Sequence, residues 1–165
     1  MSVDGVRLIG HGGGTKGQVS WLGIAPEDDF ALVILTNHSY GGVLTDRVAE
    51  KAYEAYLGVR EPELEPAEID VRPYLGRYTS RMADLELREI SSGLELSFEP
   101  KGGFPTADTP PSAPPPPASV RFASEDELFC VDDVWKGTRG LFLRDPQGRI
   151  EWLRIGGRVY AAVDS

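Results

Sequence analysis

The sequence has a single cysteine, Cys130, and only two histidines, His11 and His38, among its 165 residues. One cysteine excludes an internal disulfide framework and a cysteine-rich zinc site, and two histidines exclude a site built from several of them. No apolar run approaches the roughly 20 residues that a membrane-spanning helix needs. The first residues also lack the basic stretch and apolar segment of a signal peptide. We therefore predict no metal, no cofactor and no membrane span.

Basic residues are scarce as well. Lys and Arg number 17 against 26 Asp and Glu, which gives a net charge of −9 at pH 7. An acidic chain without a basic block is a poor ligand for nucleic acids and for anionic membrane surfaces, so we predict no nucleic-acid partner. The chain is 41% hydrophobic and 26% charged, which is ordinary globular usage. Its length fits one domain or two small ones.

Two irregular segments divide the chain. Residues 61–73 contain five acidic residues and three prolines, and this composition predicts a linker. Residues 102–119 hold seven of the 13 prolines, including the run Pro114–Pro117. Such a run favours polyproline II and cannot join a hydrogen-bonded ladder, so we predict a solvated loop between two strands. A ligand for a proline-recognising domain is the alternative.

The segment before the linker, residues 1–60, is predicted to form strands followed by one helix. The candidate strands are residues 6–9, 18–25 and 30–35. The run 30–35 is continuously apolar, as expected of a strand that is covered on both faces. Thr45 is a candidate cap for a helix that ends at Leu57, and Gly58 stands just past that end.

The segment after the linker, residues 74–165, is predicted to be entirely β. Eight short stretches alternate apolar and polar residues and are separated by turn signals. Gly156 and Gly157 form the clearest signal, because a type I′ hairpin turn needs positive φ at both central residues. Short alternating strands at this spacing predict a small antiparallel barrel, with residues 102–119 as its proline-rich loop.

The string Gly10-His-Gly-Gly-Gly-Thr15 carries the functional signal. Gly12, Gly14 and Gly17 match the dinucleotide pattern G-x-G-x-x-G, but that site needs a helix after the loop, and here a strand follows. A P-loop needs Gly-Lys-Ser/Thr, whereas Lys16 is followed by Gly17. The His-Gly-Gly-Gly turn of α/β-hydrolase esterases requires a G-x-S-x-G motif, which the sequence does not contain.

With its context, the string resembles the third active-site motif of the serine β-lactamase and penicillin-recognising family, particularly its esterase-like and D-aminopeptidase-like members. The context is a strand with Trp21, an acidic turn, an apolar strand and a helix, over about the first 58 residues. The resemblance implies His11 and Gly14 as catalytic residues and Gly12, Gly13 and Thr15 as substrate-binding residues. It implies a small acyl or peptide-like substrate, and the second segment resembles, more weakly, a lipocalin-like barrel appended to such peptidases.

The fold that follows from this resemblance is an α+β fragment joined to a barrel. Residues 1–60 would be the C-terminal part of a β-lactamase-like domain, with antiparallel strands and one C-terminal helix. Residues 61–73 would be the linker, and residues 74–165 the mainly antiparallel β-barrel.

Glycine suits a strand that must approach a substrate with its backbone, because it has no Cβ. Acyl transfer develops negative charge on a carbonyl oxygen, and each preorganised backbone N–H donor contributes on the order of 3 kcal/mol to stabilising it. We expect the Gly14 N–H to be one such donor. An imidazole at His11 would polarise the network around a nucleophile or hold a substrate carboxylate.

Two motifs of that family are missing. No serine is followed by lysine three residues later, and the single asparagine, Asn37, has Leu35 two residues before it, so S-x-x-K and Tyr-x-Asn are both absent. We therefore expect a C-terminal portion of a serine hydrolase that is inactive alone, because a donor strand has no nucleophile to serve. Its expected partner is the missing N-terminal portion or a second copy. No compartment is assigned, because such a portion need not contain the native N-terminus.

A non-catalytic binding or interaction module is the alternative. In that interpretation the β segment holds a small apolar ligand, and Trp135, Phe142 and Trp152 are the candidate lining residues. Cys130 is predicted to be a buried small hydrophobe.

Overall fold

The computed structural model divides into two compact units, Met1–Glu63 and Leu64–Ser165, and each is described by itself. It describes residues 2–15, 17–38, 41–60, 63–103, 106–132 and 135–163. Glu61 and Pro62 of the predicted linker, and Phe104 and Pro105 of the proline-rich loop, therefore lie outside the described residues.

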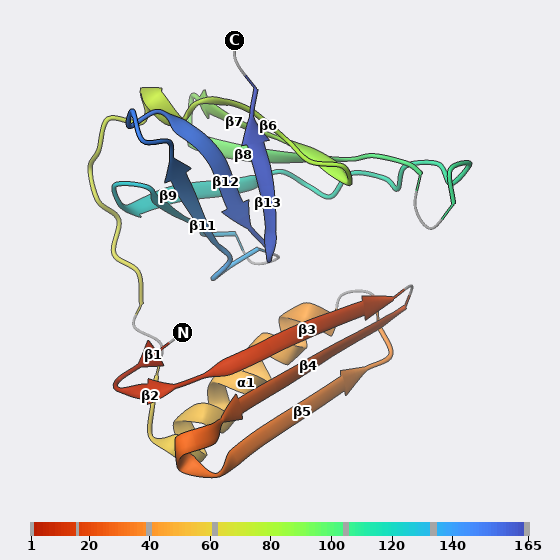
Figure 1. Ribbon diagram of the computed structural model, residues 1–165, viewed down its shortest axis with the longest axis vertical. Helices are drawn as coiled ribbons and strands as arrows, with labels where there is room; N and C mark the ends of the chain where they lie inside the picture. The colour runs from red at the N-terminus through yellow and green to blue at the C-terminus, as the bar shows by residue number, and fades with distance from the viewer. Residues whose placement is uncertain are drawn as a thin grey trace. The chain divides into compact units, whose positions relative to one another are not determined.

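The first unit is a three-stranded antiparallel sheet with one helix. The sheet has the order β3-β4-β5, and β1 and β2 form a separate two-stranded ribbon. The elements are β1 (Ser2–Val3), β2 (Val6–Arg7), β3 (Ile9–Thr15), β4 (Gln18–Ala25), the 3-10 turn η1 (Pro26–Asp28), β5 (Phe30–Thr36) and α1 (Gly41–Leu57). Figure 1 shows α1 running along one face of this sheet.

Helix α1 begins four residues before the predicted cap. Thr45 lies inside the helix, where its side chain is buried and its hydroxyl donates to the Gly42 carbonyl across 2.8 Å. A Cβ at Gly41 would lie 1.8 Å from the Thr36 side-chain oxygen, so only glycine lets the helix start this close to β5. Thr45 as a cap is therefore wrong. The predicted end is confirmed, because the helix stops at Leu57 and Gly58 has a φ of +68°.

A hydrogen bond between aromatic side chains fixes α1 to the sheet. The Trp21 indole N–H donates to the Tyr53 hydroxyl across 3.1 Å. Gly23 makes room for this contact, because a Cβ there would lie 1.9 Å from that hydroxyl oxygen. Next to this contact, a small core of Val3, Leu8, Ala25 and Val59, against which Tyr53 packs, joins the ribbon and the chain after α1 to β4.

The second unit is a closed barrel of eight antiparallel strands, so the predicted antiparallel barrel is confirmed. A 3-10 turn, η2 (Arg72–Tyr74), leads into it. The strands are β6 (Gly76–Thr79), β7 (Ala83–Ile90), β8 (Gly93–Pro100), β9 (Ala118–Ser124), β10 (Glu127–Cys130), β11 (Arg139–Arg144), β12 (Ile150–Ile155) and β13 (Arg158–Ala162). The last strand closes the barrel on the first, with Ala161 opposite Thr79 and Ala162 opposite Tyr78.

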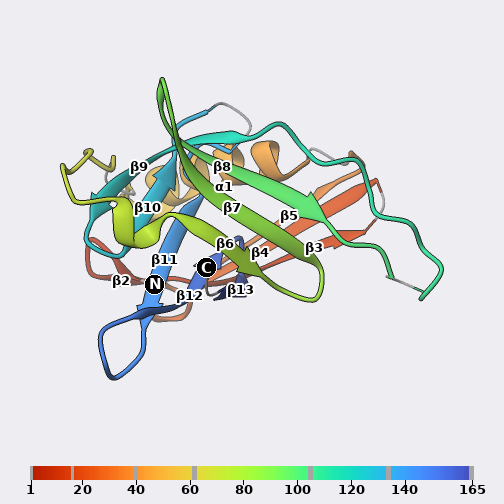
Figure 2. The same ribbon diagram turned by 90° about the horizontal axis from the view of Figure 1, so that it is seen from above.

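In such a barrel, every second connection between consecutive strands lies at the same end. The turn of Gly156 and Gly157 has φ values of +57° and +73°, which confirms the predicted hairpin. The long β8–β9 connection extends away from the barrel wall in both views (Figures 1 and 2). Its described residues, 101–103 and 106–117, form no strand or helix, whereas Ala118 and Ser119, the last two residues of the predicted loop, belong to β9.

Aromatic side chains fill one end of the barrel. The Tyr74 ring lies 4.7 Å from Phe122 and 4.8 Å from Phe142, measured between ring centroids. Arg144 donates to the Tyr74 hydroxyl across 3.0 Å and forms an ion pair with Asp126, over the outside of this cluster. Cys130 is 2% exposed inside the barrel, as predicted. The barrel thus has one end packed with rings.

The predicted α+β fold class is wrong. Across the described residues the protein is mostly β, with α1 as its one α-helix against 13 strands. The fold class was inferred from a motif that covers only the first third of the sequence. In that stretch α1 is the one described α-helix, and the barrel strands form most of the remaining structure, so β structure predominates.

Candidate functional site

The strand β3 carries all the residues predicted for the site. It contains His11, the glycines 12–14 and Thr15, and it lies at the edge of the described three-stranded sheet. All seven of its residues are exposed. Its only described partner strand is β4, with Gly12 opposite Trp21 and Gly14 opposite Val19. The glycine run is therefore part of an edge strand, and the candidate strand 6–9 is divided between β2, which ends at Arg7, and β3, which begins at Ile9.

The glycines at positions 12 and 14 of β3 are required neither by the backbone nor by packing within this unit, whereas a Cβ at Gly10 would lie 2.6 Å from the Trp21 ring. None of the four glycines of β3 has a positive φ. A Cβ at Gly12 would be 3.7 Å from its nearest neighbour and one at Gly14 would be 4.0 Å away, which are ordinary contact distances. At Gly13 the one close neighbour is the Ser20 hydroxyl, at 2.8 Å. The described residues therefore tolerate side chains at Gly12 and Gly14, and leave bare backbone there.

Alternation along β3 divides its residues between two faces of the sheet. Gly12 and Gly14 share the face of Trp21, on which α1 packs. His11, Gly13 and Thr15 point to the opposite face. His11 lies opposite Leu22 in the register, and Gly13 opposite Ser20, whose hydroxyl donates to the Gly13 carbonyl across 3.4 Å.

The face that carries His11 is apolar and exposed. Val33 is 62% exposed and Leu35 is 77% exposed, and Ile9 and Leu22 on β3 and β4 are more than two-fifths exposed. The run 30–35 was predicted to be covered on both faces, whereas burial along β5 alternates strictly. Helix α1 covers one face only, and the second face is bare in the described residues.

The His11 side chain forms no hydrogen bond or ion pair with a described residue. The same residues contain no group of three or more His, Cys, Asp or Glu side chains placed to hold a metal ion. None of the described helices is long and apolar enough to cross a membrane. The edge strand thus offers backbone donors, an imidazole and an apolar face.

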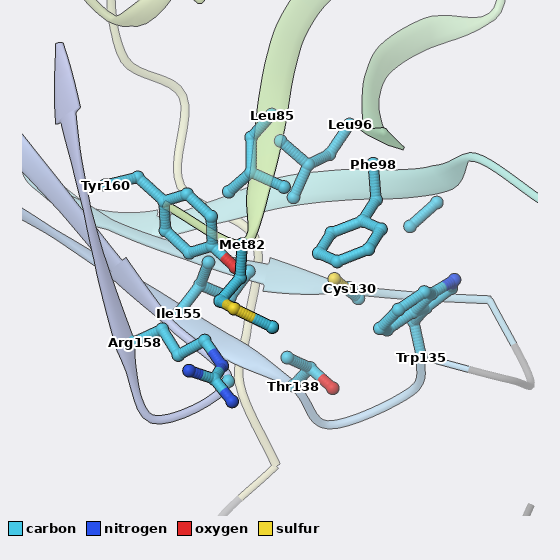
Figure 3. Close-up of a pocket in the computed structure, with 12 residues that line it drawn as sticks. Met82, Leu85, Leu96, Phe98, Cys130, Trp135, Thr138, Ile155, Arg158 and Tyr160 are labelled. Atoms are coloured by element: carbon cyan, nitrogen blue, oxygen red, sulfur yellow. The ribbon is translucent and has the colours of Figure 1, made fainter. Parts of the chain in front are cut away.

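The structure contains a second candidate site, whose position the sequence did not predict. The barrel end opposite the aromatic cluster contains a cavity of about 240 Å³ (Figure 3). Apolar side chains of the barrel interior form its floor and walls: Leu85, Leu96, Phe98, Ala118, Cys130 and Ile155. Residues of the connections at this end complete it, among them Met82, Trp135 and Thr138.

The three aromatic residues predicted to line a ligand site have different positions. Trp135 lines the cavity. Phe142 stacks on Phe122 in the closed end, at 5.8 Å between centroids, and Trp152 is 37% exposed on the outside of the barrel. For these two residues the prediction is wrong, because the sequence does not show which end of a barrel a ring fills. Arg158 and Tyr160 line the cavity and were missed; the alternation Arg158-Val159-Tyr160 was the available signal.

Comparison with known proteins finds a relative that matches only part of this chain. No protein-family model matches the sequence. Penicillin-binding protein 4 of Amycolatopsis lactamdurans is 39% identical over 83 residues, which cover 46% of this chain and 21% of that protein. At most, this match supports a relationship to the penicillin-binding proteins and to a serine hydrolase family. The chain spans about a fifth of the length of this relative.

Solved structures with a similar fold are titled SurE with D-Leu and SurE. They are 22% and 21% identical to this chain, with TM-scores of 0.54 and 0.52. The likeness covers 94% and 93% of this chain but only 35% and 34% of those chains. At this identity the likeness shows the fold alone. The neighbours are SurE and not a β-lactamase, so the predicted β-lactamase-like fold fails on this comparison as well.

Proposed function

We propose that this chain is the C-terminal portion of a serine hydrolase related to the penicillin-binding proteins, and that β3 is the strand against which the substrate lies. The main observation in support of this proposal is the glycine run at residues 12–14. It lies on an exposed edge strand, has no positive φ, and at Gly12 and Gly14 has room for side chains. An approaching substrate backbone would account for glycine at these positions.

The chemistry of an edge strand suits acyl transfer. In an antiparallel pair, alternate residues of the outer strand direct their N–H and C=O groups away from the partner strand. Along residues 11–15 either alternate set contains a glycine, so bare N–H and C=O groups are available to a substrate. A donor fixed in the sheet needs no reorganisation when negative charge develops on a carbonyl oxygen. In this proposal the Gly14 N–H is one of the two oxyanion donors.

His11 is proposed to face the nucleophile or a substrate carboxylate. Its exposed side chain has no described partner and points to the bare apolar face. Gly12, Gly13 and Thr15 are proposed to contact the substrate. The nucleophile would come from the portion that this chain lacks, because no S-x-x-K motif is present. We also propose that this missing portion covers the bare face around Val33 and Leu35.

Assays of the chain alone test the first part of the proposal. A fluorogenic ester, a D-amino-acid peptide and a chromogenic β-lactam are added to the purified protein and to its His11→Ala variant. We expect no difference between the two proteins, because neither contains a nucleophile. Turnover by the wild-type chain above the His11→Ala rate would refute the claim that it is inactive alone.

The coding DNA upstream of Met1 tests the second part. An in-frame extension that encodes S-x-x-K followed by Tyr-x-Asn is expected. In the extended protein, Gly14→Val is expected to lower acylation by roughly a hundredfold, since one oxyanion donor is obstructed. An upstream region with no open frame would contradict the hydrolase assignment and leave the binding module as the better reading.

A further inference from the structure

We propose that the open end of the barrel binds a small carboxylic acid with an apolar body, whose carboxylate lies beside Arg158. This goes beyond the hydrolase assignment and does not depend on it, because every residue of the cavity belongs to the second unit.

The cavity is preformed by hydrogen bonds in the connections around it. The Trp135 indole N–H donates to the Pro116 carbonyl across 3.2 Å, which joins the proline-rich loop to the cavity wall. The Thr138 amide donates to the Trp135 carbonyl across 2.9 Å, and the Lys101 amide to the Met82 carbonyl across 2.8 Å. The rim is therefore held before any ligand arrives, as is usual for small-molecule sites.

The size of the cavity limits the apolar body. A cavity of about 150 Å³ holds benzene. The cavity in this barrel is about 240 Å³. On the same scale it accepts roughly ten non-hydrogen atoms. A longer chain would have to leave the barrel through the rim.

Three polar side chains also line this apolar space. Figure 3 shows Arg158 and Tyr160 on one side of the cavity, with Thr138 between Arg158 and Trp135. None of these three side chains has a hydrogen-bond or ion-pair partner among the described residues. An apolar cavity with a few converging polar groups is typical of a ligand site, in which the polar groups orient the ligand.

The charge of Arg158 selects the ligand's head group. Its guanidinium is a donor only and forms strong, charge-assisted hydrogen bonds with oxyanions such as carboxylates. Burial raises the pKa of Tyr160, so its hydroxyl stays protonated at neutral pH and is available as a second donor. Asp132, the acidic group that contributes to the raised pKa of Cys130, already accepts a hydrogen bond from the Ser119 amide. An ammonium ligand would face the guanidinium and is disfavoured.

Calorimetric titration of the full chain with octanoate, 1-octanol and octylammonium tests the proposal, because the three probes share a chain of suitable length and differ in head group. We expect octanoate to bind more tightly than the other two. Arg158→Met keeps an apolar stem and removes the charge, and should weaken octanoate binding by about tenfold or more while changing 1-octanol binding less than about twofold. Arg154→Met, at an exposed position of the neighbouring strand, is the matched control and should behave like wild type.

Cys130 provides an independent readout, because it is the only cysteine and lines the cavity. Octanoate should slow the reaction of Cys130 with methyl methanethiolsulfonate at alkaline pH, and should not affect the urea-unfolded chain. Equal binding of octanoate and 1-octanol, or unchanged octanoate binding in Arg158→Met, would overturn the carboxylate assignment. Absence of both saturable heat and Cys130 protection would overturn the site itself.

Discussion

Trp21 and Tyr53 join the sheet of the first unit to its helix through one side-chain hydrogen bond of 3.1 Å. The two residues lie 32 positions apart in the sequence, and Gly23 is the residue that leaves space for the Tyr53 hydroxyl. This contact between α1 and the sheet therefore depends on the absence of a side chain at Gly23, two residues after Trp21.

Gly23→Ala should destabilise the first unit by about 1–3 kcal/mol, since the new methyl group displaces Tyr53 and breaks its hydrogen bond. Gly12→Ala is the matched control, because its Cβ would meet nothing closer than 3.7 Å. Hydrogen exchange of the β4 and β5 amides, followed by mass spectrometry, measures the effect. Equal protection in the two variants would show that α1 is not attached in this way.

Acid should weaken the barrel through Asp84. Although burial raises the pKa of this carboxyl, hydrogen bonds from Lys101, Thr79 and Arg77 lower it from 3.8 to about 2. Its stabilising contribution is therefore complete above pH 3.8 and is lost as the pH falls through about 2. We expect a loss of about 1–2 kcal/mol over that interval.

Urea unfolding at several pH values checks this prediction. Asp84→Asn should remove this part of the acid dependence. The exposed Asp70, whose pKa hydrogen bonds from Arg72 lower to about 2, provides the control. Asp70→Asn should retain the part due to Asp84. An unchanged acid profile in Asp84→Asn would contradict the assignment.

The single thiol should be nearly inert in the folded protein. Burial, with a smaller contribution from Asp132, raises the pKa of Cys130 to about 12. At pH 8 we expect its reaction with an aromatic disulfide reagent to be at least about a hundredfold slower than that of a free cysteine, because the thiolate is the reactive form. Unfolding in urea should restore the ordinary rate. Rapid reaction without urea would mean that the barrel opens readily.

The bare face of the first unit should promote self-association when the chain is alone. Val33 and Leu35 are the most exposed apolar residues on it, and large exposed apolar patches commonly mark interaction sites. Light scattering at rising concentration should show association for the wild-type chain and less for Leu35→Lys. Val159→Lys, an exposed position on the barrel, should have no such effect. If the wild-type chain remains monomeric at high concentration, the prediction that this face promotes self-association is wrong.

The sequence predicted local features better than the arrangement of the parts. The turn at Gly156 and Gly157 could be predicted because positive φ at two consecutive residues has few solutions. The start of α1 could not, since Gly41 and Gly42 have low helix propensity and the close contact of Gly41 with Thr36 is a tertiary effect.

The same distinction applies to the candidate sites. The glycine strand was found because its lack of side chains is visible in the sequence. The cavity was not located, because inward positions alternate along every strand and do not reveal whether they fill the packed end or the hollow one. Phe142 and Tyr160 have the same inward alternation but lie at different ends of the barrel.

The barrel closes through its last strand, with Ala161 and Ala162 of β13 beside Tyr78 and Thr79 of β6. One edge of β6 therefore stays unpaired during synthesis until β13 has been made. Contacts between such distant segments form slowly, and an open edge strand is prone to pair with other chains. Synthesis that stops before β13 would leave this seam open and expose the newly made chain to aggregation.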